Sequence, residues 1–322
     1  MRRLLGCLAI CAAPLLLGAC VGNVHLSFLD AQGPVAAAQR WHFYWVLGIM
    51  ALLVAGPIFL VLPFFVWRYR LGNRNSKYTP RWDFSRFLEI ASWGGPIIIV
   101  GVLAYFVWTD SHKLDPYKPL VSNQPALHVQ VIGYDWKWLF IYPDQGIATI
   151  GTLVLPAGRP VAMQLTSATV MQSFFIPSLG SQIYAMGGMV TQLHLEAARP
   201  GRFLGENTMY SGDGFHAQKF TAVAMSPRDF DAWARRVRAH GAPLDAPLAK
   251  AIARRDTRDE LLADLPPGAA FDGNVYLTGV SPAVFPAVVR ATQDGGAVAP
   301  PLLPPGAPAA PDQRTSRAEA LR

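Results

Sequence analysis

Two long runs without a charged side chain constrain this chain more than any other feature. The first spans Trp41 to Trp67 and the second spans Ile90 to Thr109, and neither contains Asp, Glu, Lys or Arg. A helix of about twenty residues is about 30 Å long, which matches the apolar thickness of a bilayer. The tryptophans at both ends of the first run suit the membrane interface. We therefore predict two membrane-spanning helices, over 41–67 and 90–109.

The loop between these runs predicts their orientation. Its charged residues are basic, with the single exception of Asp83: Arg68, Arg70, Arg74, Lys77, Arg81 and Arg86. Basic loops stay on the cytoplasmic side, so both ends of the hairpin should lie outside. The net charge of +7 is then explained by topology. No nucleic-acid-binding motif accompanies it, and we predict no nucleic-acid partner.

The pattern of the first twenty residues is typical of a targeting segment. A basic start precedes an apolar core, Leu4 to Leu17, that is too short for a stable membrane span. The core ends in Leu17-Gly18-Ala19-Cys20, which resembles a bacterial lipobox. We predict a lipoprotein signal peptide over 1–19, a lipidated Cys20 and a periplasmic linker over 20–40, in the bacterial inner membrane. The alternative is a plain signal peptide with an incidental cysteine.

The rest of the chain changes to short apolar segments separated by turns. After a connector over 111–126, strand spacing predicts a Greek-key β-sandwich over 127–225. Ser226-Pro227 predicts the start of a helix over 226–240. Residues 241–322 form a C-terminal extension rich in Ala, Pro and Arg, of which Pro300 to Arg322 should be disordered. The predicted strands are Leu127–Tyr134, Trp136–Tyr142, Ile147–Leu155, Val161–Thr166, Val170–Ile176, Gln192–Ala197, Arg202–Met209 and Lys219–Met225.

Several ordered motifs, spread over roughly residues 20 to 240, carry a family resemblance. They include Gln172-Ser173-Phe174-Phe175-Ile176-Pro177 continuing to Met189, Gly133-Tyr134-Asp135-Trp136-Lys137-Trp138, and Tyr210-Ser211-Gly212. This pattern resembles subunit II of the haem-copper respiratory oxidases, on the ubiquinol-oxidising, cytochrome bo side. The resemblance implies a membrane-anchored α+β fold, with a transmembrane hairpin followed by a cupredoxin-like sandwich. It also implies subunit I and the smaller oxidase subunits as partners, with membrane lipid and, for the whole complex, ubiquinol.

The same family includes cytochrome c oxidases, whose sandwich holds a two-copper centre. Its ligands are two thiolates, two imidazoles, a thioether and a backbone carbonyl, and soft thiolates are needed to bridge the copper pair. The resemblance places the carbonyl donor at Gly212 and the five side-chain positions at Gln172, Tyr210, Gly214, Gln218 and Thr221. None of these five side chains is a matching ligand. The three cysteines of the chain, Cys7, Cys11 and Cys20, all precede the sandwich.

We therefore predict no metal and no cofactor in this chain, with haems and copper in subunit I. We interpret His128, His194 and His216 as surface or packing residues, because scattered histidines without regular spacing rarely bind a metal. Trp136 matches a tryptophan that passes electrons in the copper-bearing relatives. Here an aromatic anchor that needs a partner for its indole N–H is the favoured interpretation. Its neighbours Asp135 and Lys137 are expected to be solvated.

Glu89 lies at the cytoplasmic mouth of the second span. It could be an ordinary interfacial charge, but the resemblance implies a proton-entry residue for the large subunit. The predicted function is subunit II of a proton-pumping ubiquinol oxidase that reduces oxygen to water, with no catalytic residue in this subunit. Two alternatives remain: a copper-bearing cytochrome c oxidase subunit II, and a membrane-anchored lipoprotein acting as a binding or assembly module.

Overall fold

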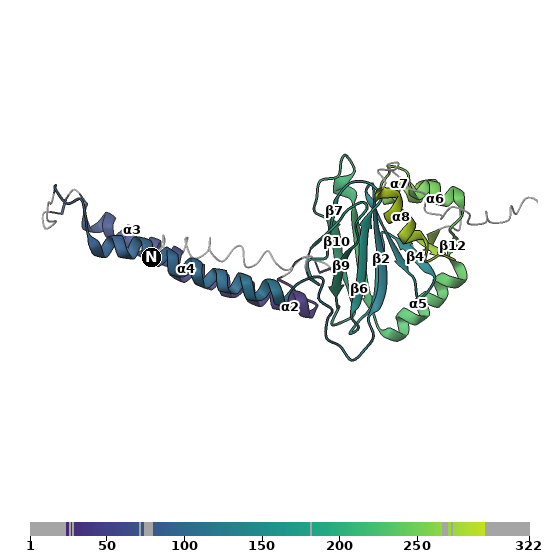
Figure 1. Ribbon diagram of the computed structural model, residues 1–322, viewed down its shortest axis with the longest axis horizontal. Coiled ribbons are helices and arrows are strands. Elements are labelled where there is room, and N and C mark those ends of the chain that lie inside the picture. Colours follow the sequence, from purple (N-terminus) through teal and green to yellow (C-terminus); the bar gives the residue numbers. More distant parts are fainter. Residues whose placement is uncertain are drawn as a thin grey trace, which may run out of the picture. The chain divides into compact units, whose positions relative to one another are not determined.

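The chain forms two compact units, one helical and one rich in β-strands (Figure 1). A computed structural model describes residues 24–25, 27, 29–70, 72–73, 80–180, 182–265, 270–271 and 273–293. The helical unit is Ala37–Asp115, and the other unit contains the described residues up to Ala36 and from Pro116 onward. The predicted signal peptide, the predicted lipidation site Cys20 and the predicted disordered segment Pro300–Arg322 lie outside the described residues.

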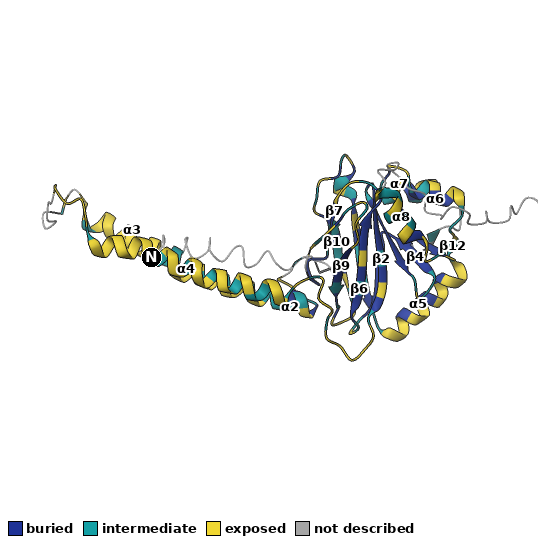
Figure 2. Cartoon of the chain, in the orientation of Figure 1, coloured by how far each residue is buried: buried dark blue, intermediate teal, exposed yellow. Residues whose placement is uncertain are grey.

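The helical unit contains two candidate membrane spans. The first, Pro34–Arg68, joins α2 (Pro34–Met50), the π-helical segment η2 (Ala51–Ala55) and α3 (Gly56–Arg68); the second is α4 (Arg86–Lys113). Both are long and apolar enough to cross a bilayer, with mean hydropathies of 2.6 and 1.9. Their apolar side chains are largely exposed (Figure 2), as expected for surfaces that contact lipid or other helices. Both helices extend beyond the predicted runs because polar residues outside the hydrocarbon continue the helix.

A proline accounts for the irregular middle of the first span. Pro57 has no N–H to donate to the carbonyl four residues earlier, and the chain widens into a π-turn just before it, closed by Gly56 N–H donating to Ala51 O. The two spans are joined by an ion pair between His42 of α2 and Asp110 of α4. Because these residues lie at opposite ends of the two helices in sequence, the helices run antiparallel.

The β-rich unit is built from two sheets (Figure 1). Parallel pairing of β2 with β6 and of β5 with β11 requires the long crossings of a Greek key. The first sheet has the order β5 (Thr152–Pro156), β11 (Lys219–Met225), β10 (Gly201–Asn207), β7 (Gln172–Phe175) and β8 (Ile183–Ala185), with β1 (Val24–His25) beside β10. The second has the order β12 (Ala242–Pro243), β14 (Asn274–Thr278), β4 (Ile147–Ile150), β3 (Lys137–Tyr142), β2 (Leu127–Tyr134), β6 (Val161–Ser167) and β9 (Thr191–Leu195), with β13 (Ala270–Phe271) beside β14.

An aromatic cluster fills the space between the sheets. Phe174 of the first sheet stacks on Phe220 with ring centroids 5.0 Å apart, and its edge meets Trp138 of the second sheet at 5.3 Å. Phe140 packs on Phe220 at 5.2 Å. Alternation along the strands brings these rings inward, because successive side chains of a strand point to opposite faces.

Four predicted strands differ from the structure by only one or two residues at their ends, and two further predicted strands differ in a way that changes the path of the chain. The predicted strand Ile147–Leu155 is wrong as a single element, because it is broken at Gly151 into β4 and β5, which belong to different sheets. Gly151 has φ +75°, a conformation that only glycine adopts readily, and it allows the chain to cross between the sheets. The predicted strand Trp136–Tyr142 begins instead at Lys137. Trp136 has φ +66° and belongs to the two-residue turn between β2 and β3.

The C-terminal extension adds a third layer that the sequence did not reveal. The predicted cap is confirmed at α5 (Pro227–His240), where Ser226 Oγ accepts from Asp229 N–H. Beyond it, α6 (Ala246–Ile252), α7 (Arg258–Asp264) and α8 (Val284–Gln293) pack with β14 against the outer face of the second sheet. Strand β3 is consequently buried on both faces, which explains the unbroken apolar run from Trp138 to Tyr142.

Phe174→Ala should lower the free energy of unfolding by about 3–5 kcal/mol, because it leaves a cavity among three aromatic rings. The half-exposed Tyr184→Ala on edge strand β8 is the matched control and should cost less than about 1 kcal/mol. Urea unfolding of the detergent-solubilised chain, followed by near-UV circular dichroism, measures both. Equal losses in the two variants would contradict the aromatic core.

Candidate functional site

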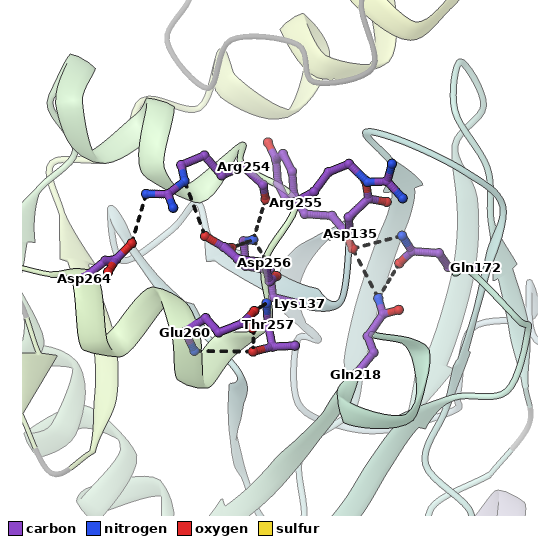
Figure 3. Close-up of polar contacts among 11 residues, drawn as sticks. Asp135, Lys137, Gln172, Gln218, Arg254, Arg255, Asp256, Thr257, Glu260 and Asp264 are labelled. Atoms are coloured by element: carbon purple, nitrogen blue, oxygen red, sulfur yellow. Dashed lines mark hydrogen bonds and ion pairs between the residues drawn. The ribbon is translucent and has the colours of Figure 1, made fainter. Parts of the chain in front are cut away.

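Two buried amides meet where the resemblance places the two copper-binding histidines. Gln172 begins β7, and Gln218 ends the short 3₁₀ turn η3 (Phe215–Ala217) just before β11. Gln218 Nε2 donates to Gln172 Oε1 at 2.6 Å. Both amide nitrogens also donate to Tyr134 O, at 3.0 Å from Gln172 and 3.3 Å from Gln218. Figure 3 shows the two side chains pointing toward each other.

Asn207 and Ser211 complete this polar network. Asn207 Nδ2 donates to Gln218 Oε1 at 2.8 Å, and Ser211 Oγ donates to the same oxygen at 3.2 Å. Asn207 Oδ1 accepts from the backbone N–H groups of Ser173 and Met209. All four side chains are buried, and a satisfied buried network fixes the relative positions of its strands. Asn207 and Ser211 were not predicted as site residues from the sequence, although Ser211 belongs to the Tyr210-Ser211-Gly212 motif that carries the family resemblance.

The residues present do not fit a dinuclear copper centre. The two glutamine amides occupy each other's hydrogen-bonding positions, so neither is directed at a metal. The side chain of Tyr210 is 73% exposed, and Thr221 lies on β11 with its half-buried side chain away from the core residues Phe220 and Ala222. The structure thus brings together Gln172 and Gln218, but not Tyr210 or Thr221. Within the described residues, no group of three or more His, Cys, Asp or Glu could hold a metal.

Trp136 packs on the loop that carries Tyr210 and Gly214, the two positions that the resemblance matches to copper-binding cysteines. Its Nε1 donates to Ser211 O at 3.2 Å, which is the partner that the sequence interpretation required. A Cβ atom added to Gly214 would lie 2.2 Å from Trp136 Cδ2, and one at Gly212 would lie 3.5 Å from Trp136 Cζ2. Gly214 is therefore required because the indole packs directly on the backbone of this loop.

The prediction that Asp135 and Lys137 are solvated is wrong. Asp135 is 4% exposed and pairs with Arg255, whose Nε lies 3.0 Å from Asp135 Oδ2. Lys137 is 2% exposed, and its Nζ donates to Arg254 O at 2.8 Å, to Asp256 O at 2.9 Å and to the Asp256 carboxylate. The C-terminal extension makes the difference, because residues 254–256 lie over the β2–β3 turn (Figure 3).

The contact between residues 254–256 and the β2–β3 turn involves charged side chains from both segments. Arg255 also lies over the Trp136 ring, with its Cζ 5.5 Å from the ring centroid, which is a cation–π distance. Burial lowers the pKa of Lys137, while the hydrogen bond and charge of Asp256 oppose that shift. The segment is continued by α7, whose first turn is fixed by a capping box between Thr257 and Glu260. The hydrogen bond from Thr257 N–H lowers the pKa of Glu260.

The other predicted site residues lie apart from this network. Glu89 is in the first turn of α4 with an exposed side chain, and its Oε1 accepts from Trp93 Nε1 at 3.1 Å. His128 and His216 are exposed, and His194 Nδ1 lies 3.0 Å from Pro116 O. These surroundings agree with surface or packing roles for the three histidines.

Comparison with known proteins identifies the family. Residues 147–218 match the family described as cytochrome c oxidase subunit II, periplasmic domain. The cytochrome bo(3) ubiquinol oxidase subunit 2 of Pseudomonas putida is 46% identical over 228 residues, covering 71% of this chain and 72% of that protein. The ubiquinol oxidase subunit 2 of Acetobacter aceti is 42% identical over 260 residues, covering 80% of this chain and 83% of that protein. The chain belongs to the ubiquinol oxidase subunit 2 family.

The family assignment confirms the cupredoxin-like fold and the ubiquinol-oxidase reading over the copper-bearing alternative. Among solved structures, the chain is similar to the periplasmic domain of cytochrome oxidase subunit II of Bradyrhizobium japonicum. The identity is 21% and the TM-score 0.34, over 36% of this chain and 96% of that chain. As a ubiquinol oxidase subunit 2, the chain is a membrane-anchored part of an oxidoreductase complex that contains other subunits.

Lys137→Met should lower the free energy of unfolding by about 3–5 kcal/mol, because it leaves the Asp256 carboxylate and two carbonyls without their buried donor. The double variant Lys137→Met/Asp256→Leu should recover part of the loss, since no uncompensated charge is left. Asp264→Asn, which breaks the exposed pair with Arg254 and leaves Asp256 untouched, is the control and should cost under about 1 kcal/mol. Chemical unfolding of all three variants tests this, and an equal cost for Asp264→Asn and Lys137→Met would contradict it.

Gly214→Ala should displace the Trp136 indole and destabilise the sandwich by about 1–3 kcal/mol through overpacking. Backbone strain is not the cause, because Gly214 has φ −86°. In a Trp136→Leu background the same substitution should cost clearly less, because the ring carbons it meets are gone. A thermodynamic cycle over the four proteins, measured by urea unfolding, checks the coupling; an additive result would show that the two residues do not interact.

Proposed function

We propose that this chain is the copper-free subunit II of a proton-pumping ubiquinol oxidase in a bacterial inner membrane. The observation that carries the proposal is the buried hydrogen bond between Gln172 and Gln218, which stands where copper-bearing relatives would place two imidazoles. Ubiquinol dissolves in the bilayer, so its electrons can enter the complex from the membrane without a relay in this sandwich. The haems and copper that reduce oxygen to water then belong to subunit I.

The chain itself then serves as an anchor and a support. Its two apolar helices are suited to pack beside subunit I and lipid, with the basic loop 68–86 in the cytoplasm. The sandwich lies in the periplasm, and a lipid on Cys20 adds a second membrane attachment. Within this role the chain contributes no residue to the redox chemistry, and it associates with subunit I and the smaller subunits.

Oxygen uptake by the purified complex tests the proposal. Ubiquinol and reduced cytochrome c are offered separately, and the metal content of the complex is determined in parallel. Uptake with ubiquinol alone, with no copper beyond that of subunit I, is expected. Oxidation of cytochrome c, or copper bound to this chain, would overturn it. Absence of a haem-bearing subunit from the purified material would instead support the lipoprotein alternative.

We also propose that Glu89 collects protons at the cytoplasmic end of the complex. Its carboxylate is exposed on the first turn of α4, and the indole of Trp93, one turn further along, donates to it. An indole donor orients the carboxylate and leaves its second oxygen free to exchange a proton. The resemblance to the oxidase family supports this role, because it implies a proton-entry glutamate at this position.

Glu89→Gln should lower ubiquinol turnover and proton uptake while the complex assembles normally. The amide keeps an oxygen that can accept from Trp93 Nε1, but it cannot carry a proton. Glu89→Asp keeps the acid and should retain most of the activity. Oxygen consumption and proton uptake in reconstituted vesicles measure both variants. Wild-type rates in Glu89→Gln would remove Glu89 from the proton pathway.

A further inference from the structure

A cavity of about 430 Å³ lies on the side of the first sheet that faces away from the aromatic core. Its floor is formed by β5 and β11, where Val154 and Val223 are neighbours in the parallel pairing. Helix α5 contributes Trp233, and β14 contributes Tyr276. The volume falls in the range of small-molecule sites in proteins. We call this space the arginine cavity, after the three arginines that line it: Arg202, Arg236 and Arg258.

In the described part of the chain, the arginines of this cavity have few acidic neighbours. Among the described residues that line it, none is acidic. In the described part of the chain, neither Arg202 nor Arg236 forms an ion pair with a carboxylate. Arg258 pairs only with the adjacent Asp259, whose side chain is 83% exposed. Three arginines thus line one concave space, and none of the described residues supplies it with a buried counter-charge.

The fold holds each of these arginines in place. Arg202 lies opposite Val223 in the antiparallel pairing of β10 and β11. Arg236 follows Trp233 by three residues on α5, which places both on the same side of the helix. The side chain of Arg258 crosses Gly151, where an added Cβ would come within 2.1 Å of Arg258 Cδ. Gly151, already needed for the crossing between sheets, therefore also makes room for Arg258.

Further polar groups line the same space. The hydroxyl-bearing residues Thr152 and Thr221 contribute from β5 and β11. Trp233 is 4% exposed, and its Nε1 has no hydrogen-bond partner within the described residues. The cavity thus combines three arginines and two threonines with a smaller apolar part of its lining, which includes Val154, Val223 and Met225. Guanidinium groups bind the oxygens of phosphate and carboxylate in pairs, and such hydrogen bonds are stronger than neutral ones.

We propose that the arginine cavity binds a small molecule that carries an oxyanion, either phosphate or carboxylate. The oxyanion pairs with the arginines, and the apolar part of the lining, Val154, Val223 and Met225, contacts the rest of the molecule. This site is separate from the glutamine network and from Glu89, and it does not depend on the role of the chain in electron transfer. The phosphate of a lipid headgroup and a phosphate in solution have the same chemistry here.

Equilibrium dialysis of the full detergent-solubilised chain against radiolabelled inorganic phosphate, and separately against citrate, tests the site. Arg202→Gln and Arg236→Gln should each weaken binding about tenfold or more, because each removes a charged hydrogen bond. Arg235→Gln is the matched control: it removes the same charge from an exposed residue of α5 outside the cavity, and it should bind like the wild type. Thermal unfolding confirms that the variants are folded.

Two results would overturn the proposal: no saturable binding of either anion, or an equal loss in Arg235→Gln and Arg236→Gln, which would indicate non-specific charge attraction. A second arm distinguishes the source of the oxyanion. The chain is placed in nanodiscs of neutral lipid, with or without phosphatidylglycerol, and phosphate binding is repeated. Loss of phosphate binding only with the anionic lipid supports a headgroup ligand, and unchanged binding supports a ligand from solution.

Discussion

A hydrogen bond between two buried amides, those of Gln172 and Gln218, holds together the end of the sandwich at which the resemblance places the copper ligands. A metal centre would cross-link β7, β11 and the loop between β10 and β11. Here the glutamines, Asn207 and Ser211 connect the same elements. Each member has a partner, so the network can be buried at little cost.

The second constraint is the burial of the second sheet on both faces. The aromatic cluster covers the inner face, and α6, α7 and α8 cover the outer face. The same extension reaches the β2–β3 turn, where Asp256 pairs with Lys137 and Arg255 covers Trp136. A lysine at this depth is tolerated only because a carboxylate and two carbonyls surround it. The extension thus encloses the turn that borders the glutamine network.

Local sequence patterns predicted the structure correctly where the type of residue alone determines the local conformation. The charge-free runs predicted both apolar helices, and Ser226-Pro227 predicted the start of α5. Strands β2 and β11 have the predicted bounds because apolar residues alternate along them. The prediction failed at Gly151, since a single glycine within an apolar run does not show whether the strand continues or crosses to another sheet. It also failed at Asp135 and Lys137, because their partners lie more than a hundred residues away.

The sequence by itself determined that this chain has two apolar helices, a β-sandwich without cysteine, and no set of thiolate ligands for copper. These conclusions depend on residue types, which are fixed before folding. Only the tertiary structure decided that Gln172 and Gln218 bond to each other, which charges are buried, and where Arg202, Arg236 and Arg258 come together. Those features arise between segments far apart in the chain, and a hydrogen bond or an ion pair depends on distances that folding alone sets.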